Sequence, residues 1–302
     1  MIVCSKLNGS GYDRIAEKYD QFFGLDNPYY GPITNREREL FDLYVPEAKT
    51  GDRALDIGCG TGLHTEWLTE KGYSTVGVDI SKQMLHVAKR KSRFKTPRPT
   101  FIEADALTLD RSDVSKGRFQ IIVCLGSTLN HFSDWRRLTR VVSNLLTPKG
   151  VFVFSYDNLI DIDSLRWLIP GRAERQRKDM LRRFNRIVRA IIRRRKFQNH
   201  WRIVTDRGTV EIPLTYESTF QHRKYLDSSR LKLISLSGVH VMTRLSQRVV
   251  LASNVRTELD QKSIDNQMTR LLSYFDNLVS KNLPSFSANV VGVARKIIEK
   301  QE

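Results

Sequence analysis

The chain has 302 residues, 40% hydrophobic and 27% charged, which suffices for one substantial core with a small appended lobe. No apolar run approaches the roughly 18 residues of a membrane-spanning helix, no secretory signal layout opens the sequence, and the three widely spaced cysteines predict neither a disulfide framework nor a metal site. We therefore expect a cytoplasmic globular protein, whose formal net charge of +17 is unevenly distributed.

Short apolar segments alternate with amphipathic helices from residue 51 onward. The expected strands cover 53–58, 74–80, 99–107, 119–126 and 151–157, and the expected helices cover 63–72, 81–92 and 134–147. Because strands that alternate with helices pair in parallel through right-handed crossovers, this pattern predicts an α/β fold with a doubly wound sheet. Ligands of such sheets bind beyond the carboxyl ends of the strands.

A glycine-rich turn follows the first expected strand. Gly58, Gly60 and Gly62 allow a tight turn that brings backbone N–H groups against a ligand, and the next helix points its positive end at the same place. Asp79, at the end of the second strand, could accept both hydroxyls of a ribose. These features fit NAD as well as S-adenosylmethionine.

Further details favour S-adenosylmethionine. The glycines are spaced Gly-x-Gly-x-Gly, Asp56 precedes them by two residues, and Asp105 closes the third strand. Together "LDIGCGTG", "VDIS", "EADAL" and "IIVCLGSTLNHF" resemble the ordered motifs of class I S-adenosylmethionine-dependent methyltransferases, over about residues 10–158. The resemblance implies their Rossmann-like fold, a seven-stranded, mostly parallel sheet.

The resemblance also implies cofactor contacts. The glycine loop would hold the methionine part, the acid after the second strand the ribose, and the acid after the third strand the adenine. The residues expected to bind the cofactor are Tyr19, Arg36, Asp56, Gly58, Gly60, Gly62, Asp79, Ile80, Asp105, Ala106 and Leu125. Asp56 has an alternative role as a brace for the loop, Arg36 could be a solvated helix residue, and Ile80 and Ala106 could be ordinary strand-end residues.

Within the family, "VCLGSTLNHFSDW" and "IAEKYDQFF" look like glycine and sarcosine N-methyltransferases and their small-amine relatives. By that resemblance Tyr19, and with it Tyr12, lies near the reactive methyl group. The chain departs from the glycine enzymes at Ser127, where they carry Asn, and at "SYDNL", where they carry an Arg-Asn pair. A neutral or cationic amine, or a hydroxyl, therefore remains open as the acceptor.

The catalytic candidates are His131, Tyr19 and Asp157. His131 follows the fourth strand above the expected cofactor site, where it could act as a base or cap the next helix. Tyr156, Asp157 and Asn158 end the fifth strand and are expected to face the pocket, where Asp157 could pair with a cationic acceptor.

Residues 159–225 are expected to form an insertion between a first core segment, 1–158, and the rest of the core, 226–302. Residues 171–196 hold twelve Lys and Arg against two acids, and 178–197 predict a basic amphipathic helix. This helix could lie on an anionic membrane, contact RNA or serve as a lid. Beyond it, the pattern predicts a β-hairpin at 200–219 that caps the site, strands at 231–241 and 287–297, the latter antiparallel, and a helix at 262–280.

The sequence thus predicts a methyltransferase that uses S-adenosylmethionine and acts on an amine of a small or lipid-like molecule. The alternatives are O- or C-methylation of a quinone, polyketide or other hydrophobic hydroxyl compound at a membrane surface, RNA methylation, and a binding module that holds the cofactor without catalysis. The sequence does not predict an oligomeric state.

Overall fold

The computed structural model describes residues 11–25, 30–158, 181–182, 185, 196–205, 208–240 and 289–297. Most of the expected basic helix at 178–197, all of the expected helix at 262–280, and Cys4 lie outside these residues. The three roles considered for the basic helix therefore remain predictions.

A seven-stranded sheet forms the centre of the molecule, in the order β3-β2-β1-β4-β5-β9-β8. Strands β1 to β5 run parallel, and β9 runs antiparallel to both β5 and β8, as predicted for the last strand. The expected doubly wound α/β fold is confirmed. The strands are β1 (Arg53–Ile57), β2 (Ser74–Asp79), β3 (Thr100–Glu103), β4 (Phe119–Cys124), β5 (Leu146–Asp157), β8 (Leu231–His240) and β9 (Asn289–Lys296).

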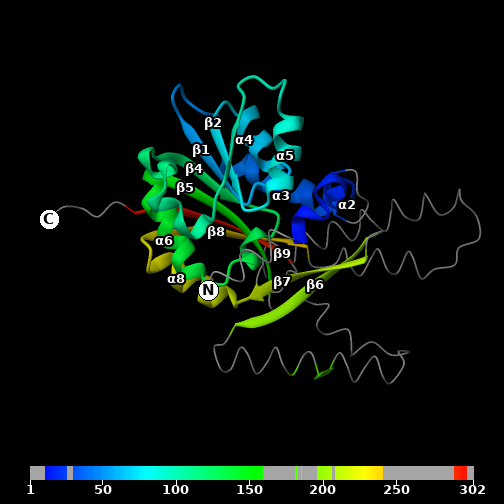
Figure 1. Cartoon of the computed structure of the whole chain (residues 1–302). Coiled ribbons are helices and arrows are strands. Elements are labelled where there is room, and N and C mark those ends of the chain that lie inside the picture. The colour runs from blue at the N-terminus through cyan, green and yellow to red at the C-terminus, as the bar shows by residue number, and fades with distance from the viewer. Residues whose placement is uncertain are drawn as a thin grey trace, which may run out of the picture.

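Helices cover both faces of this sheet (Figure 1). Because side chains alternate along a strand, Ile121 and Val123 of β4 pack with α3 (Gly31–Tyr44) and α4 (Leu63–Glu70), whereas Ile122 and Cys124 pack with α6 (Trp135–Leu145) and α8 (Thr219–Asp227). Helix α5 (Lys82–Lys91) follows β2 and begins, as predicted, at the cap Ser81, whose Oγ accepts a hydrogen bond from Met84 N at 3.1 Å.

The end of α6 differs from the prediction. The helix ends at Leu145, and Leu146 already pairs with Phe119 of β4, so that β5 begins five residues earlier than expected. The turn "TPKG" interrupts this pairing, with Lys149 at φ 65, and regular pairing resumes at Val151.

The predicted hairpin is present as β6 (Phe197–Thr205) and β7 (Gly208–Tyr216), a separate antiparallel pair outside the main sheet (Figure 1). Its buried residues Ile203, Val210 and Ile212 pack against the N-terminal segment around Ile15 and Ala16. Apolar contacts therefore fix the hairpin against the N-terminal segment.

Helix α8 was not predicted. Only His222 and Leu226 are buried on it, so its apolar pattern is too sparse to stand out from the polar sequence around it. It begins after Ser218, whose Oγ accepts a hydrogen bond from Gln221 N at 3.3 Å, and it packs on α6 and β8. The expected boundary between residues 225 and 226 therefore falls inside a core helix.

His222 should lower the free energy of unfolding in mild acid. Its ring stacks on Trp135 at 3.9 Å, is 3% exposed, and has no hydrogen-bond partner for either nitrogen among the described residues. Burial lowers its pKa from 6.5 to about 3. Between these values the unfolded chain binds a proton that the folded chain does not, so the free energy of unfolding falls as the pH falls.

The variant His222→Phe keeps an aromatic ring to stack on Trp135 and removes the group that binds this proton. Relative to the variant, the wild-type chain should lose about 2 kcal/mol of unfolding free energy between about pH 7 and pH 5. Urea unfolding of both chains at the two pH values measures this difference, and other titrating groups cancel because both chains share them. A difference that does not change with pH would contradict the prediction.

Candidate functional site

Two adjoining cavities lie beyond the carboxyl ends of β1, β2, β3 and β4. The first, the strand-end cavity, gathers seven of the residues predicted to bind the cofactor: Tyr19, Gly58, Gly60, Asp79, Ile80, Asp105 and Ala106. The second, the aromatic cavity, has a volume of about 590 Å³. The residues that line both are Tyr12, Tyr19, Gly58, Gly60, Gly126, Thr128 and His131.

The glycine loop lies where the two cavities adjoin, because Gly58 and Gly60 line both. The N–H groups of Gly58 and Cys59 both donate to Val78 O, at 2.8 and 3.0 Å, so the loop folds back over β2. A Cβ atom on Gly60 would meet nothing within 4 Å, which leaves open space above the loop. Gly62 lines neither cavity. It is the N-cap residue before α4, with φ 93, and an added Cβ would meet Ala88 Cβ at 3.3 Å and Phe101 Cζ at 3.4 Å, so close packing accounts for this glycine.

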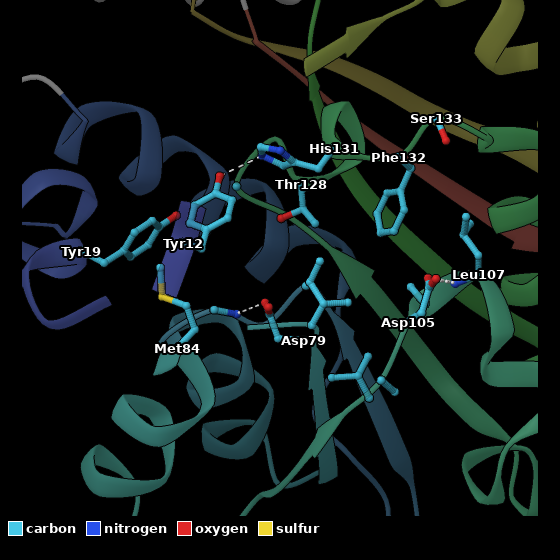
Figure 2. Close-up of a pocket in the computed structure, with 17 residues that line it drawn as sticks. Tyr12, Tyr19, Asp79, Met84, Asp105, Leu107, Thr128, His131, Phe132 and Ser133 are labelled. Atoms are coloured by element: carbon cyan, nitrogen blue, oxygen red, sulfur yellow. Dashed lines mark hydrogen bonds between the residues drawn. The ribbon is translucent and has the colours of Figure 1, made fainter. Parts of the chain in front are cut away.

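Two acids mark different ends of the strand-end cavity (Figure 2). Asp79 accepts hydrogen bonds from Gly60 N at 2.9 Å and Ser81 N at 2.8 Å, one on each oxygen, and burial raises its pKa. Asp105 accepts from Leu107 N at 2.9 Å. Both carboxylates are thus held in place with lone pairs left over, because a carboxylate offers about four acceptor positions.

Besides Gly62, two of the predicted cofactor residues lie outside the cavities. Asp56 is fully buried and accepts a hydrogen bond from Thr65 Oγ1 at 2.6 Å, which matches the alternative role as a brace, and burial raises its pKa. Arg36 pairs with Glu39 on the outer side of α3. The structure therefore does not bring Arg36 to the site, and its solvated alternative describes it better.

The neighbour of Arg36, Glu37, reaches the aromatic cavity instead. It is 4% exposed, accepts a hydrogen bond from Gly126 N at 3.2 Å, and lies 3.6 Å from His64 Nε2. The sequence held a signal for it, because Glu37 shares the inward face of α3 with Leu40 and Phe41 at helical spacing.

His131 lies where the two cavities meet, and its Nε2 is 2.9 Å from the hydroxyl of Tyr12 (Figure 2). Burial lowers the pKa of His131 to about 4, so the ring is neutral near pH 7. It does not cap α6, because Asp134 does so by accepting from Arg137 N at 2.9 Å. Burial raises the pKa of Tyr12 and of Tyr19, which keeps both hydroxyls protonated.

At the end of β5, Asp157 and Asn158 line the aromatic cavity as expected, but Tyr156 does not. Tyr156 points to the opposite face of the sheet, where it packs on Trp135 and its hydroxyl lies 3.0 Å from Thr219 Oγ1. The prediction for Tyr156 was wrong because neighbouring residues of a strand face opposite sides.

Leu125, a predicted cofactor residue, lines the aromatic cavity. Several other lining residues were not predicted. The strand-end cavity adds Met84, Leu107, Thr128 and Phe132, and the aromatic cavity adds residues of the N-terminal helices and the hairpin. Nothing in their residue types separates them from ordinary core positions.

The described ranges hold no cluster of His, Cys, Asp and Glu that could bind a metal ion, and none of the helices seen there is long and apolar enough to cross a bilayer. Cys59 and Cys124 are buried, unpaired thiols whose pKa values burial raises.

The chain matches known methyltransferases. Residues 54–150 match the family described as "Methyltransferase domain". Glycine N-methyltransferase of Mus musculus is 29% identical over 175 residues, 54% of this chain and 58% of that protein. Glycine/sarcosine N-methyltransferase of Halorhodospira halochloris is 29% identical over 157 residues, 49% and 55% of the two chains. The match therefore spans less than two thirds of these relatives.

The fold is also that of solved structures. An S-adenosylmethionine-dependent methyltransferase from Clostridium acetobutylicum aligns with a TM-score of 0.53 at 17% identity, over 95% of this chain and 99% of its own. At that identity the likeness concerns the fold alone. The family match over residues 54–150, the similar N-methyltransferases and the shared fold together support a class I S-adenosylmethionine-dependent methyltransferase, with S-adenosylmethionine as its cofactor.

Proposed function

We propose that this protein transfers a methyl group from S-adenosylmethionine to the nitrogen of an organic amine. The observation that carries the proposal is the junction of the two cavities, where Tyr12, Gly58, Gly126 and His131 line both. A donor in one cavity and an acceptor in the other would meet there. The relatives named for N-methylation of glycine and sarcosine support a nitrogen acceptor.

The residues present fit the cofactor. Asp79 would hold the ribose and Asp105 the adenine amino group, with Ile80 and Ala106 against the ring, and the open space above Gly60 would admit the methionine part. S-adenosylmethionine would supply a methyl group activated by its sulfonium: the amine lone pair would bond to the methyl carbon as the methyl–sulfur bond breaks, with S-adenosylhomocysteine as the leaving group. The protein's part is to align the two reactants and to exclude water.

A free amine attacks with its own lone pair, and the ammonium that forms releases its proton to solvent afterwards, so the amine must be oriented but needs no base in the displacement. We assign Tyr12 and His131 to orienting the amine N–H. A neutral His131 can accept a hydrogen bond at Nε2 from the Tyr12 hydroxyl, whose oxygen can in turn accept from the amine N–H. With its low pKa, His131 is a weak base, which suits an amine better than a hydroxyl, since a hydroxyl needs stronger base assistance.

A methyl transfer assay with labelled S-adenosylmethionine and a panel of amines, phenols and RNA tests the proposal. Label in amines supports it, and label confined to phenols or RNA would overturn it. Cofactor binding without transfer to any acceptor would favour the alternative of a binding module. Peripheral membrane contact through residues 178–197 remains a separate prediction.

The pH dependence of the rate should be set by the pKa of the acceptor amine and not by the pKa of His131. Because an amine attacks as the free base, kcat/KM should rise with pH through the pKa of the amine, while His131, with a pKa of about 4, is already neutral. Two acceptors with different amine pKa values should therefore show different rising limbs. The variant His131→Asn should lower the rate about tenfold or more and leave each limb in place. A common limb near neutral pH that disappears in His131→Asn would contradict this assignment.

A further inference from the structure

Aromatic rings form a continuous row along the aromatic cavity. Neighbouring ring centroids lie 5.3 Å apart for His131 and Tyr12, 6.0 Å for Tyr12 and Tyr19, 4.8 Å for Tyr19 and Phe23, and 5.0 Å for Phe23 and Trp201. Figure 2 shows the end of this row at Tyr12, Tyr19 and His131, beside the strand-end cavity. The row thus runs from the junction of the cavities to the hairpin, and all five rings line the aromatic cavity.

Three carboxylates of the described residues line the same cavity as this row. Asp20, Glu37 and Asp157 line the aromatic cavity, and the one Lys or Arg among its described lining residues is Lys91, whose Nζ lies 2.7 Å from Asp20 Oδ2. The chain as a whole carries a net charge of +17, so the sign of the charge reverses inside the cavity. A positively charged guest is favoured there both by the carboxylates and by the negative faces of the rings.

Asp157 is held in a fixed position within this cavity. Its Oδ1 accepts hydrogen bonds from Ser127 Oγ at 2.7 Å and from Asn289 Nδ2. Ser127 takes a left-handed conformation at φ 55, and its N–H donates to Ser155 Oγ at 2.9 Å. A residue other than glycine rarely takes this conformation unless its surroundings hold it there. Ser127 is therefore itself fixed in place, and with it the hydrogen bond that it donates to Asp157.

We infer that the acceptor is an amine with apolar or aromatic substituents and without a carboxylate or phosphate, and that Asp157 and the aromatic row recognise the positive charge that its nitrogen gains as it is methylated. This inference rests on the proposed function and narrows its substrate class. An amino acid or a phosphorylated amine would bring its anion near Glu37 and Asp157, and the one Lys or Arg among the described lining residues, Lys91, is already paired with Asp20.

Quaternary ammonium ions test recognition apart from catalysis, because they bind as cations and cannot accept a methyl group. Binding would be measured by calorimetry on the full chain, saturated with S-adenosylhomocysteine, for benzyltrimethylammonium, tetramethylammonium and phenylacetate. Benzyltrimethylammonium should bind, tetramethylammonium about tenfold or more weaker, and phenylacetate not measurably. Equal or tighter binding of phenylacetate would overturn the inference.

Variants locate the cation. Asp157→Asn and Trp201→Leu should each weaken benzyltrimethylammonium about tenfold, whereas Trp201→Phe should keep most of the affinity. Glu211→Gln is the matched control, because Glu211 lies on the same hairpin, pairs with exposed Arg202 and lines neither cavity. Unchanged affinity in both Asp157→Asn and Trp201→Leu would overturn the assigned position.

The two proposals fail in different ways. If benzyltrimethylammonium binds as expected and no amine accepts a methyl group, cation recognition stands and the proposed methyl transfer fails. If an amine is methylated and benzyltrimethylammonium does not bind, the transfer stands and the cation site fails.

Discussion

Replacing Asp79 with alanine should weaken the binding of S-adenosylhomocysteine about tenfold or more. The carboxylate faces the strand-end cavity, where it is assigned to the ribose hydroxyls, and it also accepts the N–H groups of Gly60 and Ser81. The substitution therefore removes an anchor for the ligand and leaves the N–H of the glycine loop without its partner. Calorimetry measures the combined effect of both losses on the affinity.

Asp52 provides a control for Asp79→Ala, because it accepts a backbone hydrogen bond in a loop away from the two cavities. Asp52 also accepts a backbone hydrogen bond, from Lys49 N at 2.9 Å, and it lines neither cavity. Asp52→Ala should therefore leave the affinity for S-adenosylhomocysteine unchanged. The more conservative Asp79→Asn should fall between the wild-type chain and Asp79→Ala, since an amide keeps one acceptor oxygen. An affinity that Asp79→Ala leaves unaltered would refute the assignment of Asp79 to the ribose.

Sequence patterns predicted the strand-end cavity well because its residues follow from chain order alone. Gly58, Gly60, Asp79 and Asp105 each lie at or within three residues of the carboxyl end of a parallel strand, and parallel strands bring these ends to one edge. Once the strands and their order are known, these residues must meet.

Predictions failed where the direction of a single side chain decided the result. Arg36 and Glu37 are neighbours on α3, and a rotation of about 100° between consecutive helical residues places Glu37 inside and Arg36 outside. Tyr156 and Asp157 differ in the same way across a strand. Reading the apolar face of α3 before assigning a charge to the pocket would have favoured Glu37.

The aromatic cavity could not be predicted because it joins segments distant in the sequence. Phe23 and Trp201 are in contact only because the hairpin packs on the N-terminal segment, and Asn130 helps to anchor that hairpin by donating to both Asp157 O and Thr215 O at 3.1 Å. No local pattern encodes such pairings. The aromatic cavity consequently depends on tertiary structure, whereas the strand-end cavity follows from the motifs.

A methyl group on Gly58 should abolish most cofactor binding, and a second substitution should restore it. Gly58 has φ 70, and an added Cβ would lie 2.2 Å from Thr128 Cγ2. Thr128 lines both cavities and is tied to Leu125 O by a hydrogen bond of 2.6 Å, so it cannot withdraw without distorting the junction. Gly58→Ala should weaken S-adenosylhomocysteine binding about 100-fold, by the combined cost of the left-handed backbone and the collision.

Two further variants separate the cost of the left-handed backbone from the cost of the collision with Thr128. Gly51 has φ 88, and an added Cβ there would meet nothing within 4 Å, so Gly51→Ala carries the backbone cost of about 1 kcal/mol in stability without any loss of affinity. Thr128→Ser removes the colliding Cγ2 and keeps the hydroxyl that donates to Leu125 O. The double variant Gly58→Ala, Thr128→Ser should thus recover about tenfold of the lost affinity while remaining less stable than the wild-type chain. Affinity that stays as low as in Gly58→Ala would mean that the loop conformation, and not the space above Thr128, limits binding.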